Sequence, residues 1–539
     1  MNVFNEHLIS FILVAPLLGS FIVALIPRSQ ERLQRWVSLL AMGAAFFLAL
    51  HLFVEFRSGT HSYQFVEWIS WIPQYGIFYH VGVDGISLLL VLLTAFLGPI
   101  TILCSWTSIQ NKVKEYHIFL LLLQVGMLGV FVAVNLFLFY IFWEAMLIPM
   151  YFLIGVWGGP RRVYATTKFV LYTLFGSLLM LVAILYLGVV SLEQFGAHLF
   201  DMSHLAQLQL SQTEQIWLFL AFALAFAIKV PLFPFHTWLP DAHVEAPTAG
   251  SVVLAGVLLK MGTYGFIRVA IPWFPEAVVR FYPWLACLSV FGIIYGALLA
   301  MVQPDLKKLV AYSSVSHLGF VMLGILSMTV QGVQGAILQM VNHGLSTGAL
   351  FLVVGILYER RHTRMIADYG GLAKQVPFTA AIFMVVCLSS LGLPGLNGFV
   401  GEFLILIGTF RWHPAYAVVA ASGVILAAVY LLWMYQRVML GKIVHEENRK
   451  LTDLRLHEWL SLIPILLWIL WIGIYPMTFL KKTETSARVF ASQTRRMFTE
   501  EIPADVVKIP DDFSLLKKED SLSGFSLKDL EGAAPEGER

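Results

Sequence analysis

Residues 229–265 read KVPLFPFHTWLPDAHVEAPTAGSVVLAGVLLKMGTYG, and this stretch decides how the chain folds. Three prolines within residues 231–240 follow an apolar run and interrupt it, because proline removes a backbone donor and breaks a helix. A second apolar run then carries Lys260, as the first one carries Lys229 at its end. Broken helices at membrane depth are tolerated only where they line protein or water. The stretch therefore predicts an interrupted membrane helix, with charged side chains inside the protein.

The composition places the whole chain in the same class. Hydrophobic residues make up 58% of its 539 residues and charged residues only 13%, and the mean hydropathy is +0.78. Soluble domains do not have this composition, so the chain is predicted to be an all-α polytopic membrane protein. The net charge of +2 gives no indication of a nucleic-acid partner.

A helix that spans the bilayer needs about 20 apolar residues. The apolar runs predict about fourteen transmembrane helices, near residues 8–26, 34–54, 85–105, 116–134, 136–157, 169–192, 214–230, 250–270, 279–300, 307–328, 332–357, 377–397, 415–437 and 458–479. The seventh is broken by the prolines above, and the twelfth by Leu393, Pro394 and Gly395.

Basic residues predict the orientation of these helices. Alternate loops, such as those at residues 28–35, 112–114, 161–168 and 360–374, hold most of the Lys and Arg. The positive-inside rule places these loops in the cytoplasm. Both termini then face the outer, periplasmic side.

An offset of 160 residues separates Pro234 from Pro394, and a similar offset separates the fourth and ninth spans. This spacing predicts two five-helix repeats, and an odd number of spans forces the second copy to insert upside down, as in many transporters. The predicted units are residues 1–115 with the first three helices, 116–275 and 276–440 with the inverted repeats, 441–481 with the last helix, and 482–539 as a polar, loosely ordered tail.

Four charged side chains lie deep within predicted spans: Glu144, Lys229, Lys260 and Glu402. Each costs at least about 2.5–3.5 kcal/mol when placed in hydrocarbon on insertion scales. Such residues usually line an ion or proton path, which makes these four the primary candidate site.

Five motifs resemble one known family. They are residues 229–265, Phe142–Pro149 (FWEAMLIP), Ala311–His317 (AYSSVSH), Asn342–Gly344 (NHG) and Pro394–Phe403 (PGLNGFVGEF). Together they resemble the proton-pumping, antiporter-like membrane subunits of NADH–quinone oxidoreductase, respiratory complex I, over about residues 1–480. Cation/proton antiporter subunits share the same fold.

The charge in the twelfth span separates these relatives. It is typically a glutamate in M-type subunits and a lysine in L-type, N-type and antiporter subunits, and here it is Glu402. The resemblance therefore implies an M-type subunit that moves protons. The alternatives are a subunit of a multi-subunit cation/proton antiporter and a scaffold subunit with a vestigial channel.

The resemblance implies a role for each charge. Burial disfavours the charged form of Lys229, and a nearby Glu144 would restore it, so the pair is expected to switch the protonation of the lysine. Lys260 would lie centrally and Glu402 at the exit. The structural alternatives are a static Glu144–Lys229 ion pair, a Lys260 that snorkels to an interface, and a Glu402 that caps a half-helix.

Histidines complete the expected path. His317 and His343 are expected between Lys260 and Glu402, because histidine titrates near neutral pH; the alternative is a buried structural histidine. His236 and His243, with Asp241 and Glu245, are expected chiefly to cap and fix the loop. Lys168 is expected to anchor the sixth span on the cytosolic side.

No sequence motif predicts a cofactor or a metal on this chain. Cys104, Cys287 and Cys387 are far apart in apolar runs and form no CxxC pair, so a cluster or metal bound by cysteine is not expected. Flavin and iron–sulfur clusters are expected in partner subunits. The expected partners are the other membrane subunits of complex I, including two related antiporter-like subunits, in the cytoplasmic membrane of a bacterium.

Overall fold

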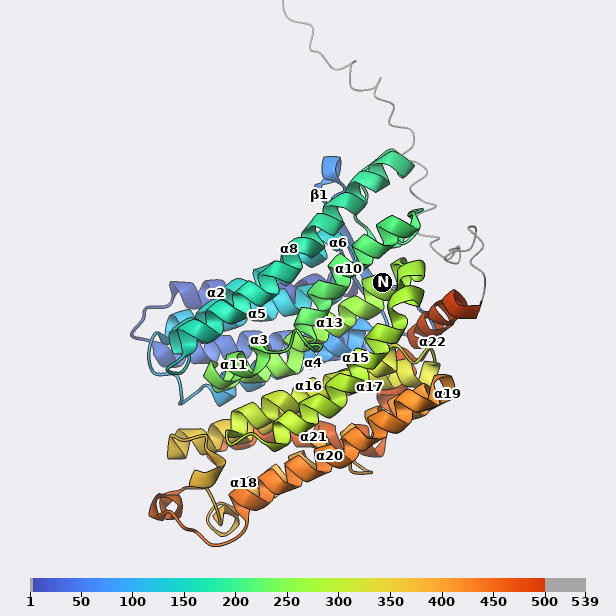
Figure 1. Cartoon of the computed structure of the whole chain (residues 1–539). Coiled ribbons are helices and arrows are strands. Elements are labelled where there is room, and N and C mark those ends of the chain that lie inside the picture. The colour runs from blue at the N-terminus through green and yellow to red at the C-terminus, as the bar shows by residue number, and fades with distance from the viewer. Residues whose placement is uncertain (1–2, 500–539) are drawn as a thin grey trace, which may run out of the picture.

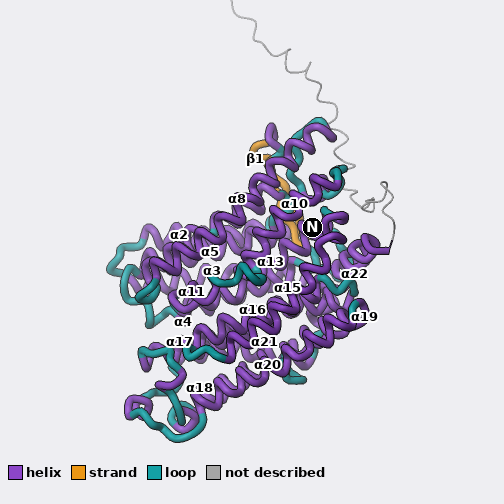
Figure 2. Tube along the Cα trace, in the orientation of Figure 1, coloured by secondary structure: helices purple, strands orange, loops and turns teal. Residues whose placement is uncertain are grey.

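The computed structural model describes residues 3–499. Twelve helices of these residues are long and apolar enough to cross a membrane. The two interrupted helices described below complete the predicted fourteen. The helices run roughly parallel through one bundle (Figure 1), and helix is the dominant structure along the trace (Figure 2). The predicted all-α polytopic fold is confirmed.

Three helices precede the first repeat, which then contains five spans. The first three are α2 (Leu8–Leu25), α3 (Glu31–Glu55) and α4 (Ser87–Cys104). The repeat contains α5 (Val113–Val132), α6 (Leu136–Ala145) with α7 (Leu147–Trp157), α8 (Arg162–Phe195), α10 (Gln212–Lys229) with α11 (Trp238–Glu245), and a composite span of α12 (Thr248–Val253), η2 (Leu254–Leu258), α13 (Leu259–Gly265), η3 (Phe266–Ala270) and α14 (Ile271–Trp273).

The second repeat has the same order of elements, with its broken helix again in fourth place. It contains α15 (Pro275–Met301), α16 (Leu306–Ile325), α17 (Val330–Arg361), α18 (Pro377–Ser390) with α19 (Asn397–Trp412), and α20 (Pro414–Met439). The last span, α21 (Leu456–Ile474), and the helix α22 (Met477–Thr499) follow.

Both predicted breaks are present. The seventh span stops at Lys229 and resumes at Trp238, and the twelfth stops at Ser390 and resumes at Asn397. In Figure 1 the two halves of the seventh span, α10 and α11, lie toward opposite ends of the bundle. The two halves of the twelfth span, α18 and α19, do the same. Each break therefore lies between half-helices at an intermediate depth of the bundle.

Two spans form the centre of the bundle. The most apolar window of α17 is 100% buried and that of the span Thr248–Trp273 is 94% buried, whereas the windows of α3 and α21 are only 33% buried. α17 packs against α12, α16, α18, α19 and α21. Side chains on these two central spans are therefore shielded from lipid.

Short polar side chains fix several helix starts. The side-chain oxygens of Asn135, Asp305 and Thr329 each accept a hydrogen bond from a backbone N–H in the first turn, and Ser211 with Glu214 forms a capping box. These caps satisfy donors that the helix itself leaves unpaired.

One β-hairpin interrupts the helical order. Strands β1 (Gln64–Ile72) and β2 (Ile77–Val83) pair antiparallel between α3 and α4, and Figure 2 shows β1 in orange beside the bundle. The hairpin is tied to the start of α6 because Val134 N donates to His80 O at 2.9 Å. It was missed in the sequence, although β-branched and aromatic residues in QFVEWISWI are typical of a strand.

The predicted tail boundary at residue 482 is wrong. Residues 477–499 form the amphipathic helix α22, which packs against α14, α15 and α17. Its buried face includes Phe479, Ala487 and Phe490, and the burial of this face stabilises the docked helix. The remainder of the predicted tail, residues 500–539, lies outside the described residues.

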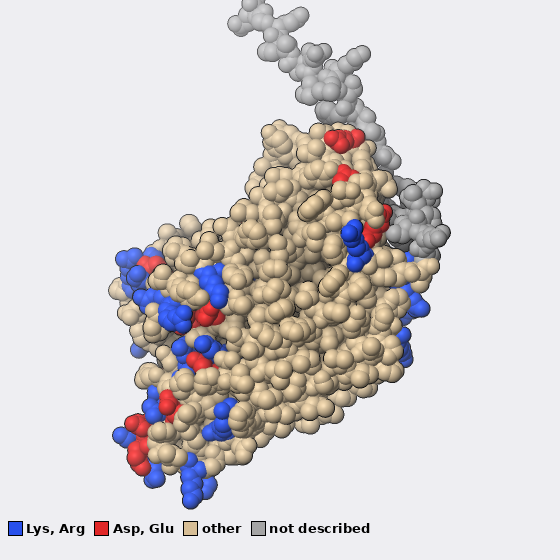
Figure 3. Space-filling view, viewed as in Figure 1, with Lys and Arg blue, Asp and Glu red and all other residues tan. Residues whose placement is uncertain are grey.

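Charged side chains are concentrated at the ends of the bundle. On the face shown in Figure 3, most of the visible Lys and Arg lie toward the end where α11 and α18 are found, and the middle carries almost no charge. An uncharged belt between two polar ends fits a protein embedded in a bilayer.

We expect Ala487→Asp to destabilise the docked helix α22, because Ala487 is 0% exposed and a lone carboxylate buried there would lack a partner. Ser492→Asp is the matched control, since Ser492 is exposed on the opposite face of the same helix. The thermal unfolding temperature of the purified complex should fall only for Ala487→Asp. Equal temperatures for the two variants would mean that α22 does not depend on this contact.

Candidate functional site

Lys260 lies at the centre of the bundle and contacts a histidine from the second repeat. Its side chain is 0% exposed, and its Nζ lies 2.7 Å from Nδ1 of His343 on α17. Nζ also donates a hydrogen bond to the carbonyl oxygen of Ala255. Lys260 therefore does not snorkel to an interface, and its ammonium group is bonded inside the bundle.

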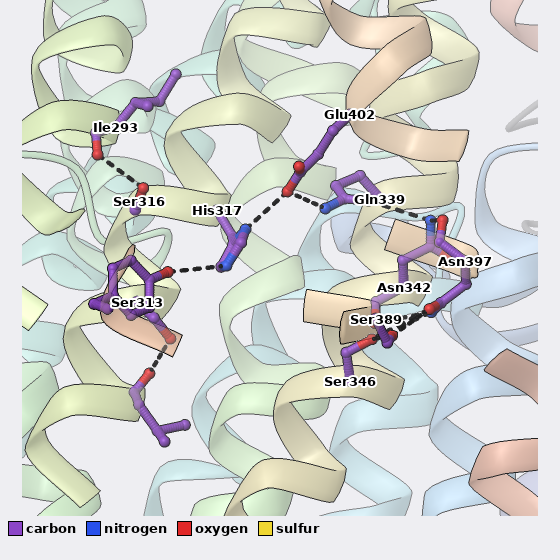
Figure 4. A network of polar contacts seen from close by, with 12 residues as sticks. Ile293, Ser313, Ser316, His317, Gln339, Asn342, Ser346, Ser389, Asn397 and Glu402 are labelled. Carbon is purple, nitrogen blue, oxygen red and sulfur yellow. Dashed lines mark hydrogen bonds and ion pairs between the residues drawn. The ribbon is translucent and has the colours of Figure 1, made fainter. Parts of the chain in front are cut away.

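Two further contacts extend this series to the twelfth span. The rings of His343 and His317 have centroids 5.9 Å apart, and Nδ1 of His317 lies 2.9 Å from Oε1 of Glu402. Tyr430 OH lies 3.3 Å from the other ring nitrogen of His317. Figure 4 shows the ring of His317 directed toward Glu402. The structure thus brings together Lys260, His343, His317 and Glu402, which were predicted as neighbours.

Glu402 is not a helix cap. It lies more than a turn inside α19, whose N-cap position, Leu396, makes no side-chain cap. Its Oε1 accepts a hydrogen bond from Nε2 of Gln339 at 3.1 Å as well as contacting His317. Oε1 of the carboxylate therefore contacts α16 and α17, and Oε2 lies beside Gly392 in the break of the twelfth span.

Amides and hydroxyls hold the broken twelfth span against α17. Asn342 Nδ2 donates to the carbonyl oxygen of Asn397 at 2.8 Å. Ser389 Oγ donates to Asn397 Oδ1 at 2.5 Å and lies 2.6 Å from Ser346 Oγ. These contacts fasten the start of α19 and the end of α18 to α17.

Two π-helical segments flank the helix turn that carries Lys260. Residues Leu254–Leu258 and Phe266–Ala270 have the wider winding, with α13 between them. A π-bulge disturbs the regular hydrogen bonding of a helix and is frequent at functional sites. Here the ammonium bonds to the carbonyl of Ala255, which lies in the first of these segments. Residues 254–270 contain no proline, and the glycines among them, Gly256, Gly262 and Gly265, do not by themselves predict this winding.

Lys229 and Glu144 do not form the static ion pair. Lys229 Nζ and Glu144 Oε1 are both buried and have no hydrogen-bond partner among the described residues. Nζ instead lies 5.3 Å from the ring centroid of Trp143 and 5.7 Å from that of Phe169, which are cation–π distances. The pair is therefore apart in this structure, with an aromatic ring next to the lysine.

Glu144 lies next to an interruption of its own span. The fifth span is divided at Met146 into α6 and α7. Pro149 explains the interruption, because it has no N–H to donate to the carbonyl of Ala145. Glu144 thus lies in the last turn of α6, directly before the interruption of the regular helix bonds.

His243 does not act as a cap. It is 0% exposed and stacks on Phe351 of α17 with centroids 4.5 Å apart. Neither of its ring nitrogens has a partner among the described residues. His236 stacks on Phe233 in the break. The loop-fixing interpretation is not supported for the His243 side chain, which lies between α11 and the central helix α17.

Lys168, Asp241 and Glu245 lie together at the Lys- and Arg-rich end. Lys168 Nζ donates to Asp241 Oδ2 at 2.7 Å and joins α8 to α11. Glu245 Oε2 accepts from the backbone N–H of Arg161 at 2.9 Å. A cavity of about 140 Å³ is lined by residues that include Asp241, Glu245 and Arg364. This polar opening lies next to the seventh-span break.

A largely buried ion pair between Arg268 and Asp84 was missed in the sequence. Arg268 donates two hydrogen bonds to Asp84, at 2.6 and 2.9 Å, and a third to Tyr264 OH at 3.2 Å. The pair connects η3 with the turn between β2 and α4, 184 residues apart in the chain. Such a separation explains why no local pattern reveals it.

The described residues contain no group of three or more His, Cys, Asp or Glu side chains that could hold a metal ion. The buried polar groups are lysines, histidines, carboxylates, amides and hydroxyls, which exchange protons or hydrogen bonds. The site is therefore equipped for proton transfer along hydrogen bonds.

Comparisons with known proteins agree with this architecture. Residues 133–428 match the family model described as NADH:quinone oxidoreductase/Mrp antiporter, TM. The chain is 47% identical over 482 residues to NADH-quinone oxidoreductase subunit M of Rhodobacter capsulatus, covering 87% of this chain and 94% of the relative. It is 46% identical over 479 residues to NADH-ubiquinone oxidoreductase chain 4 of Arabidopsis thaliana, covering 89% and 96%.

Solved structures show the same fold. A chain of respiratory complex I from Thermus thermophilus with bound NADH matches with a TM-score of 0.82 and 34% identity, covering 90% of this chain and 99% of that one. A chain of the Mrp complex from Dietzia sp. matches with a TM-score of 0.78 at 21% identity, covering 92% and 99%, which shows shared fold alone. The chain belongs to the NADH:quinone oxidoreductase/Mrp antiporter family, and within it to the M subunits of NADH–quinone oxidoreductase.

Proposed function

We propose that this chain is the proton-translocating M subunit of an NADH–quinone oxidoreductase, and that protons move through Lys229, Lys260, His343, His317 and Glu402. The observation that carries the proposal is the series of neighbouring side chains from Lys260 to Glu402, which joins the first repeat to the second. The two direct steps have hydrogen-bonding distances. The two histidine rings have centroids 5.9 Å apart, and a water molecule that bridges their nitrogens would complete the path.

Lys229 and Glu144 form the switch at the first end of this path. A buried lysine without a partner favours its neutral form, and an approaching carboxylate favours the charged form. Their separation in the structure supports a lysine ready to release its proton toward Lys260. Movement of Glu144 is made easier by the interruption of its span at Met146.

The chain is proposed to work with partners that supply the redox chemistry. NADH oxidation and quinone reduction, with flavin and iron–sulfur clusters, belong to other subunits of the complex. Two related antiporter-like subunits are the proposed neighbours in the membrane. The proposed location is the cytoplasmic membrane of a bacterium, with both termini on the periplasmic side, because basic loops favour the cytoplasm.

The second candidate function is a subunit of a cation/proton antiporter. The likeness to the Mrp complex favours it only at the level of fold. The two functions differ in one measurement: proton movement in membrane vesicles depends on NADH and quinone in the first case, and on a cation gradient in the second.

We expect Lys229→Ala and Glu144→Ala each to lower NADH-driven proton translocation by about tenfold or more, since each removes one member of an acid–base pair. Glu144→Asp should have a milder effect because the charge is kept on a shorter side chain. Lys481→Ala is the control, as Lys481 is exposed on α22. The assay is proton uptake by vesicles that contain the assembled complex. Wild-type rates in both alanine variants would exclude the switch.

Gly262→Ala should separate the two lysines of the path. A Cβ at Gly262 would lie 2.7 Å from Phe226 O and 2.8 Å from Val230 N, the backbone that flanks Lys229. Because displacements near 1 Å cost roughly a hundredfold in rate at reaction centres, proton translocation should fall by about tenfold or more. Gly292→Ala is the matched control, since its Cβ meets no atom within 4 Å. The same vesicle assay decides the matter, and equal rates in the two variants would contradict this spacing argument.

Glu402→Gln should impair proton translocation while keeping the size of the side chain. Moving one charge across 100 mV is worth about 2.3 kcal/mol, so an exit group must change protonation to release its proton against that bias. Glu402→Lys should keep partial function, since it imitates the charge of the related subunits. Glu446→Gln, at a largely exposed residue, is the control. Proton translocation and quinone-linked turnover should be measured together, and normal pumping in Glu402→Gln would remove Glu402 from the path.

A further inference from the structure

Two amide side chains on α17 connect Glu402 with the start of α19. Gln339 Nε2 donates to Glu402 Oε1 at 3.1 Å. Asn342 Nδ2 donates both to Gln339 Oε1 at 3.2 Å and to the carbonyl oxygen of Asn397 at 2.8 Å. Figure 4 shows this series running from Glu402 through Gln339 to Asn342 and Asn397. All four residues are at least 97% buried.

The direction of these hydrogen bonds fits an ionised Glu402. A carboxylate only accepts, so Gln339 must present its NH₂ group to it, and its oxygen is then left for Asn342. A protonated Glu402 instead has an O–H to donate. Gln339 can accept that hydrogen bond only if its amide turns over and presents Oε1.

A 180° rotation of the Gln339 amide requires a new acceptor for its NH₂ group. The side-chain oxygen of Asn342 is available for this. Asn342 Oδ1 is buried and has no hydrogen-bond partner among the described residues. If the Asn342 amide also turns, Oδ1 accepts from Gln339 Nε2. The Nδ2 group then leaves the carbonyl of Asn397, the first residue of the second half-helix.

We propose that Gln339 and Asn342 form a two-state amide relay that senses the protonation of Glu402 and changes the hydrogen bonding at the break of the twelfth span. Both residues are positioning residues. In one state the relay holds the carboxylate ionised and Asn342 Nδ2 bonded to the Asn397 carbonyl. In the other state it holds the carboxyl group protonated, and the Asn397 carbonyl loses its bond from Asn342 but keeps its place in the helix. Asn342 immediately precedes His343, so the relay also borders the path itself.

This relay rests on the proposed function only in requiring that Glu402 changes its protonation. The titratable groups that face Glu402 are His317 from α16, with Tyr430 from α20 behind it, and His343 from α17 beyond His317. Among the described residues, α18 and α21 contribute no hydrogen-bond partner to the carboxylate. Gln339 is therefore the uncharged partner through which its protonation is transmitted.

The test is infrared difference spectroscopy of the assembled complex in lipid, recorded as the pH is varied and without turnover. The C=O band of the protonated Glu402 is assigned by its loss in Glu402→Gln. Gln339→Met should displace this band and raise the midpoint of its titration, and so the pH up to which it persists, because hydrogen bonds to the ionised form are the stronger ones.

Asn342→Leu is the decisive variant. Asn342 does not touch Glu402, yet its loss should raise the midpoint in the same direction, because Gln339 is no longer held with its NH₂ group toward the carboxylate. Should the leucine variant fail to assemble, Asn342→Ser is expected to give the same displacement with its shorter side chain. Ser389→Ala is the control, since it removes a bond of the same network to Asn397 without touching the relay.

Three outcomes would overturn the relay. In the first, the C=O band and its midpoint in Asn342→Leu are the same as in the unmodified protein, which would mean that Gln339 donates to Glu402 without any help from Asn342. Ser389→Ala could move both as far as Asn342→Leu does, which would indicate general repacking. Glu402→Gln could remove no band, which would mean that Glu402 does not change protonation. Because no pumping is measured, loss of translocation in a variant neither supports nor opposes the relay.

Discussion

The free-energy cost of placing charge in hydrocarbon is the constraint on which this structure depends. Lys229, Lys260 and Glu402 are each less than 4% exposed, and none of them reaches an aqueous interface. The bundle encloses them by devoting two spans, Thr248–Trp273 and α17, almost wholly to the interior. Polar side chains on these spans then provide the hydrogen bonds that lipid cannot.

The interruptions in the helices follow from the same constraint. Each broken or widened segment lies beside one of the buried charges: the seventh-span break begins after Lys229, the fifth span divides at Met146 beside Glu144, and π-helical segments flank Lys260. In an intact helix each interior carbonyl already accepts one backbone hydrogen bond, whereas an interruption leaves carbonyls without that bond or in a different direction. The carbonyl of Ala255 that meets the Lys260 ammonium shows what an interruption provides.

The sequence determined the spans and both major breaks, because apolar length and proline are local properties. The resemblance to a known family also predicted that four side chains come together: Lys260, His343, His317 and Glu402. The sequence did not predict the π-helical segments, because a glycine such as Gly256 does not by itself indicate π winding. It also did not predict the Asp84–Arg268 ion pair, whose partners are 184 residues apart. The helix α22 was mistaken for a tail because its mixed charges conceal one apolar face, visible only at helical spacing in Phe479, Ala487 and Phe490.

The two ends of the path are built differently, and this difference has a physical consequence. Lys229 lies among aromatic rings without a hydrogen-bond partner, so its ionisation depends on what moves toward it. Glu402 is held by His317 and Gln339, so its ionisation depends on the orientation of groups already in contact. The first end therefore responds to displacement of a charge, and the second to reorientation of hydrogen bonds. A proton that crosses from one to the other passes from a site controlled by distance to a site controlled by donor and acceptor geometry.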